Sequence, residues 1–404
     1  MPSVIFGVLT VVFTYLIAKK LYDKKTALIA AILMGTAPLA IYYSQEARMY
    51  SLAAAATALS VYFFISIIKK DTIINWVGFI LSTTVMLYSD YLSYFMIPIY
   101  IIYLFLSRKN ISKSTLKAFI PAFLLIFIAI APWLTVFTRQ LRTGLLAAAA
   151  SPAWAQVVGT PSIKTFFLTF VKFTIGRISS NNKLLYAALF APVGAFITFL
   201  FAISFFRVSK LRSFLWLWFL GPLILAFTAS YFIPIFTYFR FIFVLPAFYI
   251  ILASAINTIN WTPLVRVLLV ITLAINLTAA AVYFTNTKFQ REDWKGATAY
   301  VIGNSTQSTV TLFEDTYTVG PFDYYNKGRV KAYGALDSFS PDPAKVHQNV
   351  ASYTNGKNNV FLFAYLSPIT DPQGLVFEEL TKEGYTNTST KDFEGVGFVY
   401  EFKK

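Results

Sequence analysis

The stretch MYSLAAAATALSVYFFISII, residues 49–68, runs for twenty positions without a charged side chain and is followed at once by Lys69 and Lys70. A helix of roughly 20 apolar residues is long enough to cross the hydrocarbon core of a bilayer. Nine further segments have a similar composition: 2–18, 26–42, 73–88, 91–106, 116–137, 184–206, 214–233, 239–259 and 263–284. The sequence therefore predicts a polytopic α-helical membrane protein with about ten transmembrane helices.

The composition of the whole chain agrees with this class. Of its 404 residues 57% are apolar and 13% are charged, whereas ordinary soluble domains carry about 25% charged residues. This balance excludes a single soluble enzyme. The chain has no cysteine and only one histidine, His347, so thiolate chemistry is excluded and a histidine-based triad has little support. The motifs GxGxxG, GxxxxGK[ST], HExxH and GxSxG do not occur, which argues against nucleotide-cradling loops and zinc hydrolases.

Charge divides the chain into two parts. Residues 1–285 carry 22 basic and 4 acidic side chains, a net charge of +18, whereas residues 286–404 carry 12 basic and 14 acidic ones, a net charge of −2. We therefore expect a transmembrane body over 1–285 and a polar domain over 286–404. The polar part has no basic stripe with interleaved aromatic residues, so nucleic acid is not an expected partner.

Lysine and arginine residues predict the orientation of the body, because cytoplasmic loops collect them. The alternate loops rich in basic residues contain Lys19, Lys20, Lys24 and Lys25; Lys69 and Lys70; Arg108, Lys109 and Lys113; Arg207, Lys210 and Arg212; and Arg266. The opposite loops, around 44–48, 89–90 and 234–240, carry only Arg48 and Arg240. We expect a multi-pass protein of the cell membrane, with the domain at 286–404 outside the cytoplasm.

Alternating patterns in the polar part predict a small α/β domain. Helices are expected over 293–302, 320–325 and 371–383, and strands over 310–314, 359–365, 385–390 and 396–402. In the body, residues 161–177 have a different pattern. Ile163, Phe166, Phe170 and Phe173 share one helical face, opposite Lys164, Thr169 and Lys172. This predicts a helix lying in the membrane interface, or an amphipathic connector packed on the bundle.

Ionisable residues inside a membrane body mark its chemistry, because each is costly at mid-bilayer. Glu46, Arg48, Asp90 and Arg240 lie instead at the expected outer ends of helices, where they can converge on one outward-facing pocket. Arginine binds phosphate oxygens bidentately, and apolar helices can hold a lipid chain. If the helix begins at Ala47, Glu46 and Tyr50 share a face while Arg48 points elsewhere. This composition suits a lipid-linked phosphate substrate.

The sequence resembles the GT-C membrane glycosyltransferases related to protein O-mannosyltransferases and the lipid A aminoarabinose transferase. The similar segments are Pro2-Ser3-Val4-Ile5-Phe6-Gly7-Val8-Leu9-Thr10-Val11, Ala37-Pro38, Tyr43-Ser44-Gln45-Glu46-Ala47-Arg48-Met49-Tyr50, Phe239-Arg240-Phe241 through Pro246 to Leu252-Ala253, and Arg291-Glu292-Asp293-Trp294-Lys295-Gly296-Ala297. They cover the chain up to about Tyr300, and the run from Ser44 to Tyr50 is the most specific.

The resemblance implies an inverting glycosyltransferase that transfers a hexosyl or pentosyl unit from a polyprenyl-phosphate-linked donor. The acceptor would be a glycan, a lipid or a protein on the outer face of the membrane, as in cell-envelope synthesis or protein glycosylation. Glu46 would hold the acceptor or a divalent cation, and Arg48 or Arg240 would stabilise the departing polyprenyl phosphate. Gln45, Tyr50, Asp90 and Tyr91 would line the same pocket, and the 161–177 helix would gate entry of the lipid.

Two departures from the family pattern affect these expectations. In the family, a general base on an aspartate precedes the segment that begins here at Pro2, so the expected base lies upstream of Met1. The chain is then expected to lack the first transmembrane helix and first outer loop, and to be inactive alone. Asp90 stands where relatives often have a histidine before a tyrosine. A membrane transporter or lipid flippase and a non-catalytic membrane scaffold remain as alternatives.

Overall fold

A computed structural model describes residues 2–150, 161–206, 211–259, 262–337 and 342–404, and the side chains of 2–146 in the first range. The chain divides into two compact units. The helical unit comprises residues 1–142 and 158–285, and the C-terminal unit comprises residues 143–157 and 286–404.

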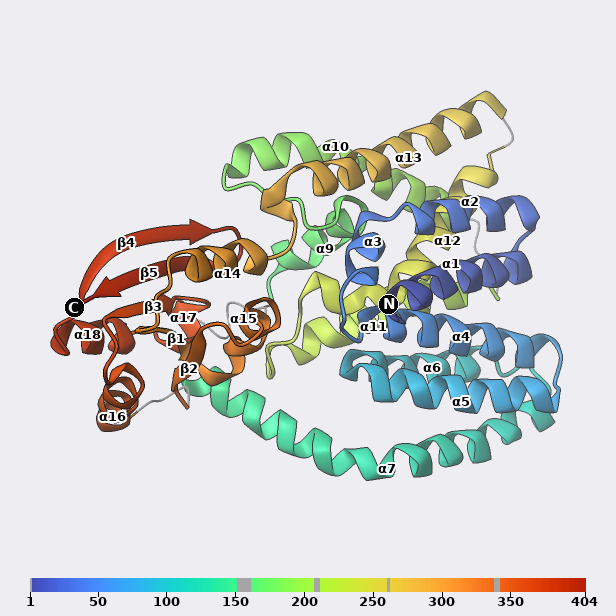
Figure 1. The fold of residues 1–404 in the computed structure, drawn as a ribbon. Coiled ribbons are helices and arrows are strands. Elements are labelled where there is room, and N and C mark those ends of the chain that lie inside the picture. The colour runs from blue at the N-terminus through green and yellow to red at the C-terminus, as the bar shows by residue number, and fades with distance from the viewer. Residues whose placement is uncertain (1, 151–160, 207–210, 260–261, 338–341) are drawn as a thin grey trace. The chain divides into compact units, whose positions relative to one another are not determined.

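Among the described residues, the helical unit consists of α-helices and two 3₁₀ segments, and its helix α7 continues beyond residue 142 into residues assigned to the C-terminal unit (Figure 1). Their bounds are α1 Pro2–Leu21, α2 Lys24–Gly35, α3 Pro38–Ser44, α4 Tyr50–Lys69, α5 Ile73–Ser89, η1 Tyr91–Phe95, α6 Met96–Ser107, α7 Lys113–Ala150, α9 Ile163–Ile175, α10 Lys183–Phe205, α11 Ser213–Ala229, η2 Tyr238–Val244, α12 Leu245–Asn257 and α13 Thr262–Thr285. Polar side chains start several of them: Asp23 accepts a hydrogen bond from the Thr26 amide at the start of α2, at 2.8 Å, and Ser162 forms a capping box on α9.

Six helices in the described residues are long and apolar enough to cross a membrane: α1, α4, Lys113–Leu146 of α7, α10, Tyr238–Asn257 and α13. The pair α2 and α3, bent by 59°, brings this number to seven if it forms one span. Three shorter apolar helices are Ile73–Ser89, Tyr91–Ser107 and Ser213–Ala229. Each of the ten predicted segments thus coincides with an apolar helix or a bent pair, while the number of spans, about ten, stays a prediction.

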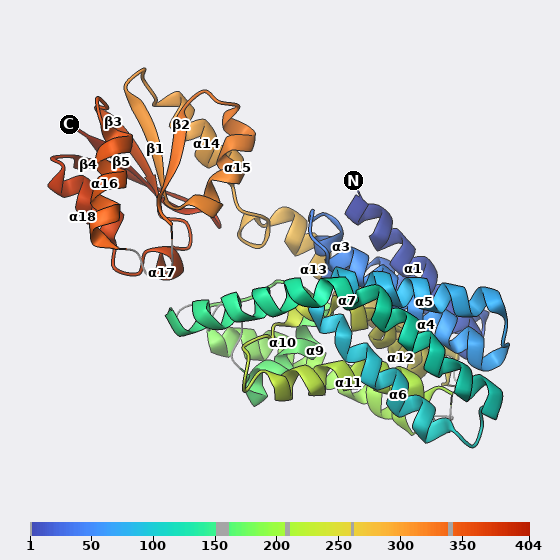
Figure 2. The same cartoon turned by 90° about the horizontal axis from the view of Figure 1, so that it is seen from below.

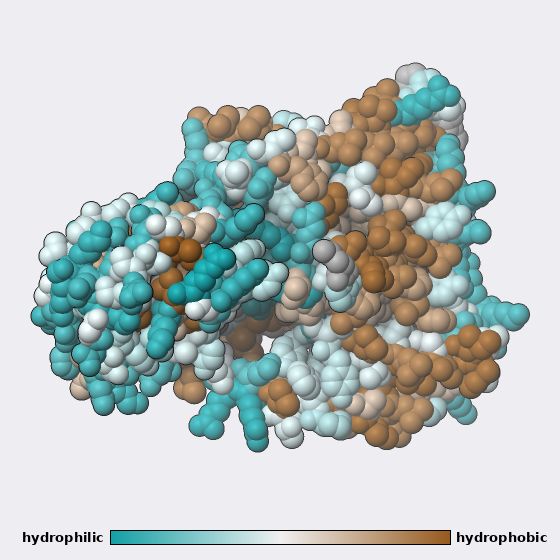
Figure 3. All heavy atoms as spheres, in the orientation of Figure 1, coloured by the Kyte–Doolittle hydropathy of each residue, from teal (hydrophilic) through white to brown (hydrophobic). Residues whose placement is uncertain are grey.

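The core of the helical unit surrounds α12, where Leu245–Ile256 are all buried. A helix that is apolar on every side is typical of the centre of a bundle, and α12 packs against α2, α10 and α11. The outer helices instead expose apolar side chains such as Ile5, Val8, Leu81 and Leu124. Figure 3 shows this surface in brown, with hydrophilic residues at the edge where the α1–α2 and α4–α5 turns lie. The helical unit therefore has the surface that a lipid environment requires.

The C-terminal unit is an α/β domain built on a five-stranded sheet of order β2-β1-β3-β5-β4. Its strands are β1 Thr309–Asp315, β2 Lys331–Leu336, β3 Asn359–Phe363, β4 Thr386–Phe393 and β5 Gly397–Lys403. β1 pairs in parallel with β2 and β3, and β5 pairs antiparallel with β3 and β4. The helical segments are η3 Thr287–Phe289, α14 Trp294–Gly303, η4 Thr316–Thr318, α15 Val319–Asn326, α16 Pro343–Thr354, α17 Ser367–Thr370 and α18 Leu375–Lys382.

Two apolar layers cover the faces of this sheet. Val310 and Leu312 of β1 pack with α16 and α18, whereas Phe313 of β1 packs with α14 and α15. This alternation follows from the two-residue period of a strand. Figure 2 shows the two helix pairs on opposite faces. The predicted helices and strands of this part are therefore present, but β2 and α16 were not predicted.

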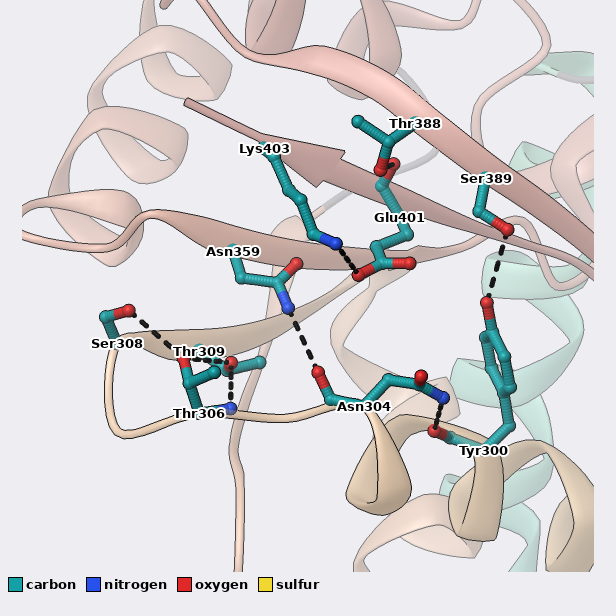
Figure 4. A network of polar contacts seen from close by, with 10 residues as sticks. All are labelled: Tyr300, Asn304, Thr306, Ser308, Thr309, Asn359, Thr388, Ser389, Glu401 and Lys403. Carbon is teal, nitrogen blue, oxygen red and sulfur yellow. Dashed lines mark hydrogen bonds and ion pairs between the residues drawn. The ribbon is translucent and has the colours of Figure 1, made fainter.

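Polar side chains form hydrogen bonds and an ion pair at one end of the sheet (Figure 4). The Asn359 side-chain amide at the start of β3 donates to the Asn304 carbonyl, at 3.2 Å, and Lys403 pairs with Glu401 on β5 at 2.8 Å. The Thr309 hydroxyl accepts from the Thr306 amide at 2.7 Å. The first contact joins the segment that precedes β1 to β3, whereas the second lies within β5 and the third joins that segment to the first residue of β1.

Candidate functional site

The loop between α3 and α4 carries Glu46 and Arg48. Because α4 begins only at Tyr50 and residues 45–49 are turns and bends, the expectation of a helix from Ala47 is wrong. The expected pairing of Glu46 with Tyr50 is also not what the structure shows: the Tyr50 hydroxyl hydrogen-bonds with the Arg48 side chain.

Contacts with α1 and α4 hold this loop in place. The Ser51 hydroxyl of α4 donates to the Tyr43 carbonyl of α3, at 2.8 Å, so the start of α4 is tied to the end of α3. On α1, Gly7 lies directly against Ser44: a β-carbon on Gly7 would be 2.2 Å from the Ser44 Oγ and 2.9 Å from its Cβ. Only glycine permits this approach, which fixes the position from which the loop departs.

Tyr50 brings together three charged side chains from three other segments. Besides its bond to Arg48, it lies within electrostatic range of Arg240 of η2 and Asp90. Asp90 stands in the break between α5 and η1, and its carboxylate interacts electrostatically with Arg240. Arg48, Tyr50, Asp90 and Arg240 therefore converge, although 192 positions separate Arg48 from Arg240.

Asp90 caps the 3₁₀ segment η1 and also contributes a carboxylate to this group. Its Oδ1 accepts a hydrogen bond from the Leu92 amide at 2.8 Å, which starts η1. Its burial raises the pKa of the carboxyl to about 6, while the Leu92 amide and Arg240 lower it. Loss of hydration outweighs both stabilising contacts, of which the Leu92 hydrogen bond is the larger, so the neutral form of Asp90 is favoured more than it is in water.

Two further predicted site residues have other partners. The Gln45 side chain accepts a hydrogen bond from the Tyr283 hydroxyl of α13, at 2.9 Å. The Tyr91 hydroxyl donates to Gln140 of α7, at 2.5 Å, and its ring packs against Phe137. Gln45 thus ties the loop to α13, and the Tyr91 side chain is directed to α7.

The sequence analysis did not assign Lys172 and Arg177 to the site. Lys172 of α9 is buried, donates to the Ile178 carbonyl, and lies 5.5 Å from the centre of the Tyr238 ring. Burial, with the nearby charge of Arg177, lowers the pKa of Lys172 to about 8. The face of α9 that contains Thr169 and Lys172 therefore packs into the protein.

Arg177 follows α9 through Gly176, whose φ of 65° is a conformation that glycine adopts without strain. The guanidinium donates to the Tyr42 hydroxyl and lies 4.6 Å from the centre of the Tyr42 ring. It also hydrogen-bonds with Tyr238. An arginine held by two phenols beside a buried lysine is arranged to receive an anion.

Tyr43 connects this pair of cations to the first group. It lies within electrostatic range of Glu46, Tyr50, Tyr238 and Arg177, and its ring packs against that of Tyr50 with the centroids 4.8 Å apart. We call the whole set the polar cluster: Tyr42, Tyr43, Glu46, Arg48, Tyr50, Asp90, Lys172, Arg177, Tyr238 and Arg240. With its lysine, arginines and carboxylates charged and its tyrosines neutral, the cluster has four cations and two anions, a net charge of +2.

Comparison with known proteins identifies the fold. Residues 1–136 match the model of a family described as dolichyl-phosphate-mannose-protein mannosyltransferase. No protein of curated function matches the chain in sequence. Among solved structures, that of ArnT from Cupriavidus metallidurans in the apo state has a TM-score of 0.58 at 10% identity, over 99% of this chain and 82% of ArnT. The fold is that of a GT-C glycosyltransferase.

Two further solved structures have a similar fold. ArnT bound to undecaprenyl phosphate has a TM-score of 0.53 at 9% identity, over 99% of this chain and 83% of ArnT. The Archaeoglobus fulgidus oligosaccharyltransferase AglB, in complex with an inhibitory peptide and a dolichol-phosphate, has a TM-score of 0.52 at 15% identity, over 98% of this chain and 62% of AglB. The chain thus spans less than two thirds of AglB. The expected resemblance is confirmed for the fold, and the chain is a multi-pass membrane protein.

In the described part of the chain, Glu46 does not belong to a group of three or more histidine, cysteine, aspartate or glutamate side chains that could hold a metal ion. There, one group of three or more histidine, aspartate or glutamate side chains lies within ligand distance of one another, and it belongs to the C-terminal unit. The polar cluster offers the carboxylates of Glu46 and Asp90 on separate segments. A metal role for Glu46 stays a prediction, and no step below uses it.

Proposed function

We propose that the protein transfers a sugar from a polyprenyl-phosphate-linked donor to an acceptor at the outer face of the membrane. The observation that carries this proposal is the polar cluster, in which Arg48, Arg240, Lys172 and Arg177 gather around tyrosines at the ends of apolar helices. The released polyprenyl phosphate, a monoester with about two negative charges, complements the excess of two cations, whereas the donor phosphodiester carries a single negative charge. ArnT has been solved with undecaprenyl phosphate and AglB with dolichol-phosphate, which supports the same class of ligand here.

In this proposal the cations act mainly on the leaving group. When the bond between the sugar and the phosphate breaks, negative charge grows on the phosphate oxygens. Arginine and lysine side chains that are already in place stabilise that charge without reorganising. Arg177 and Arg48 are each held by a tyrosine hydroxyl, and Arg240 is held near Asp90. Glu46 is assigned to the acceptor, and no residue of the cluster is assigned the role of general base.

Apolar surface beside the cluster suits the lipid chain. α9 exposes the side chains of Ile163 and Phe167 and buries that of Lys172. The same helix therefore directs a cationic side chain into the protein and apolar side chains to its surface. The predicted apolar face packs largely on the bundle, because Phe173 is buried and Phe166 and Phe170 pack against the core. This favours the alternative of an amphipathic connector packed on the bundle over a helix lying in the membrane interface. The cell membrane as location, the outer placement of the cluster and the extracytoplasmic placement of the C-terminal unit rest on the distribution of lysine and arginine among the loops.

A transporter or flippase is less well supported. The four acidic residues of 1–285 all lie outside helices: Asp23, Glu46, Asp71 and Asp90. Transporters usually place their polar site near the membrane midplane. Where α4, α5 and α6 meet, the buried polar contacts are instead between neutral hydroxyls, Ser60 with Thr83 and Tyr100, each at 2.7 Å.

The test is release of polyprenyl phosphate from a labelled polyprenyl-phosphate sugar, with the label on the sugar appearing in an acceptor. Glu46→Gln and Arg240→Ala should each reduce transfer. Glu378→Gln and Arg266→Ala make the same chemical changes at exposed positions outside the cluster and should leave transfer unchanged. Equal transfer by the wild type and both cluster variants would contradict the proposal. Binding of the labelled donor by the wild type without any transfer would favour a non-catalytic scaffold.

A further inference from the structure

The C-terminal unit contains a second group of convergent polar side chains. His347 lies on α16, and Glu379 of α18 and Glu383, at the C-terminal end of that helix, lie beside it. One atom of each, His347 Nδ1 and an oxygen of each carboxylate, lies within 4.8 Å of the others. α16 and α18 lie side by side on one face of the sheet (Figure 2).

From this group we propose that His347, Glu379 and Glu383 bind a divalent cation of the zinc type. One imidazole nitrogen and two carboxylate oxygens are a donor set that zinc accepts, with a fourth position left for water or an outside ligand. His347 is the only histidine of the chain, which has no cysteine. The strongest nitrogen or sulfur ligand available to such a cation therefore stands beside two carboxylates.

The distances fit this interpretation. His347 Nδ1 is 2.5 Å from Glu379 Oε1 and 3.9 Å from Glu383 Oε1. Ligands about 2.0–2.2 Å from a tetrahedral zinc are about 3.3–3.6 Å from one another. The observed distances bracket this range, so rotations of the side chains suffice to place a cation between them. The two helices supply the ligands without backbone rearrangement.

Lysines contact the other oxygens of both carboxylates. Lys382 lies 3.6 Å from Glu379 Oε2, and Lys404 lies 3.9 Å from Glu383 Oε2. Both contacts leave Oε1 directed to His347. Partners of this kind orient ligating carboxylates, while the positive charges of the two lysines compete with a bound cation for the same carboxylates. The Glu379 side chain is only 11% exposed, whereas that of His347 is 62% exposed, so the cation enters from the side of His347.

The experiment is a titration of the purified full-length protein, carrying no histidine tag, with Zn²⁺ alone by calorimetry after treatment with a chelator. We expect saturable binding that His347→Gln and Glu383→Gln each weaken by at least roughly tenfold, because loss of an outer partner alone costs about 10- to 100-fold. Glu378→Gln, one residue from Glu379 but outside the group, is the matched control and should bind like the wild type.

Glu46→Gln separates this site from any cation at the polar cluster, and it should also leave the binding unchanged. The sites are in different units, so failure of sugar transfer does not affect the expected result. Absence of saturable binding by the wild type, or binding that survives in His347→Gln, would overturn the proposal and leave His347 and Glu379 as an ion pair. Loss of this binding in Glu46→Gln would assign the cation to the helical unit and overturn it equally.

Discussion

Replacement of Gly7 by alanine tests how the site loop is positioned. The added β-carbon would lie 2.2 Å from Ser44 Oγ and 2.9 Å from Ser44 Cβ. Rotation of the serine hydroxyl relieves the first contact but not the second. Carbon atoms pack at about 3.5–4.0 Å, so α1 and the end of α3 must separate by roughly 0.6–1 Å.

The expected cost follows from this displacement. Overpacking of a core typically costs about 1–3 kcal/mol, which exceeds the gain of about 1 kcal/mol that alanine brings to a helix in place of glycine. Ser44 immediately precedes Gln45 and Glu46, so the displacement is passed to the loop of the site. A misplacement of about 1 Å can reduce catalysis about 10²-fold. Gly7→Ala should therefore lower both thermal stability and affinity for polyprenyl phosphate.

Two controls make the assay specific. Gly35→Ala adds the same methyl group in α2, where the nearest atoms are 3.9 Å away, and should be neutral or stabilising. Ser44→Gly removes both clashing atoms, so the double variant Gly7→Ala/Ser44→Gly should recover most of the lost affinity. Thermal unfolding in detergent and lipid binding by native mass spectrometry measure the two effects. If Gly7→Ala behaves like Gly35→Ala, or if Ser44→Gly gives no recovery, the reasoning fails.

Three further predictions concern other parts of the molecule. Arg177→Ala should weaken polyprenyl phosphate binding roughly 10- to 150-fold, because a hydrogen bond to a charged group contributes about 1.5–3 kcal/mol; Arg266→Ala is the control, and equal affinities would remove Arg177 from the site. Ser162→Ala should destabilise α9 by about 0.5–2 kcal/mol, seen as faster hydrogen exchange of its amides, and unchanged exchange would contradict the role of the capping box. Burial raises the pKa of Glu314 from 4.5 to about 7 despite hydrogen bonds from Thr370 and Ser367, so between these pH values the folded state keeps a proton that the unfolded state has released. Stability of the C-terminal unit should then fall by about 3 kcal/mol as pH rises from 4.5 to 7; Glu314→Gln should abolish this fall, and an identical pH profile in the variant would be evidence against it.

Periodicity and composition were sufficient to predict most of the fold. A long apolar run in lipid satisfies its backbone hydrogen bonds by forming a helix, so the helices of the body were predicted. The strand β3 was predicted from its continuous apolar sequence. β2 was not predicted because its sequence, Lys331–Leu336, includes a glycine and is largely half-buried, so it lacks both a continuous apolar run and clear alternation. α16 is mostly polar and buries only Val346, Val350 and Thr354. The Asp342-Pro343 pair at its start was the available signal.

The site could be predicted only in part. The distribution of lysine and arginine among the loops predicted that Glu46, Asp90 and Arg240 lie at the same depth in the membrane, because all three are at the outer ends of helices. The pairing of Tyr50 with Arg48 depends on where α4 begins, which involves the tertiary contact between Ser51 and Tyr43. A lysine on the polar face of an amphipathic helix suggests solvent, so the burial of Lys172 against Tyr238 and Tyr186 was not foreseeable.

The most direct test of the central claim is the affinity of the wild-type protein for polyprenyl phosphate compared with the polyprenol of equal length, measured in the same detergent. The two lipids differ only in the phosphate, so their ratio reports what the polar cluster recognises. We predict that the phosphate binds at least about tenfold more tightly, as one hydrogen bond to a charged group requires, and that Arg177→Ala and Arg240→Ala reduce this preference. Equal affinity of the wild type for both lipids would contradict the assignment of the polar cluster as a phosphate site.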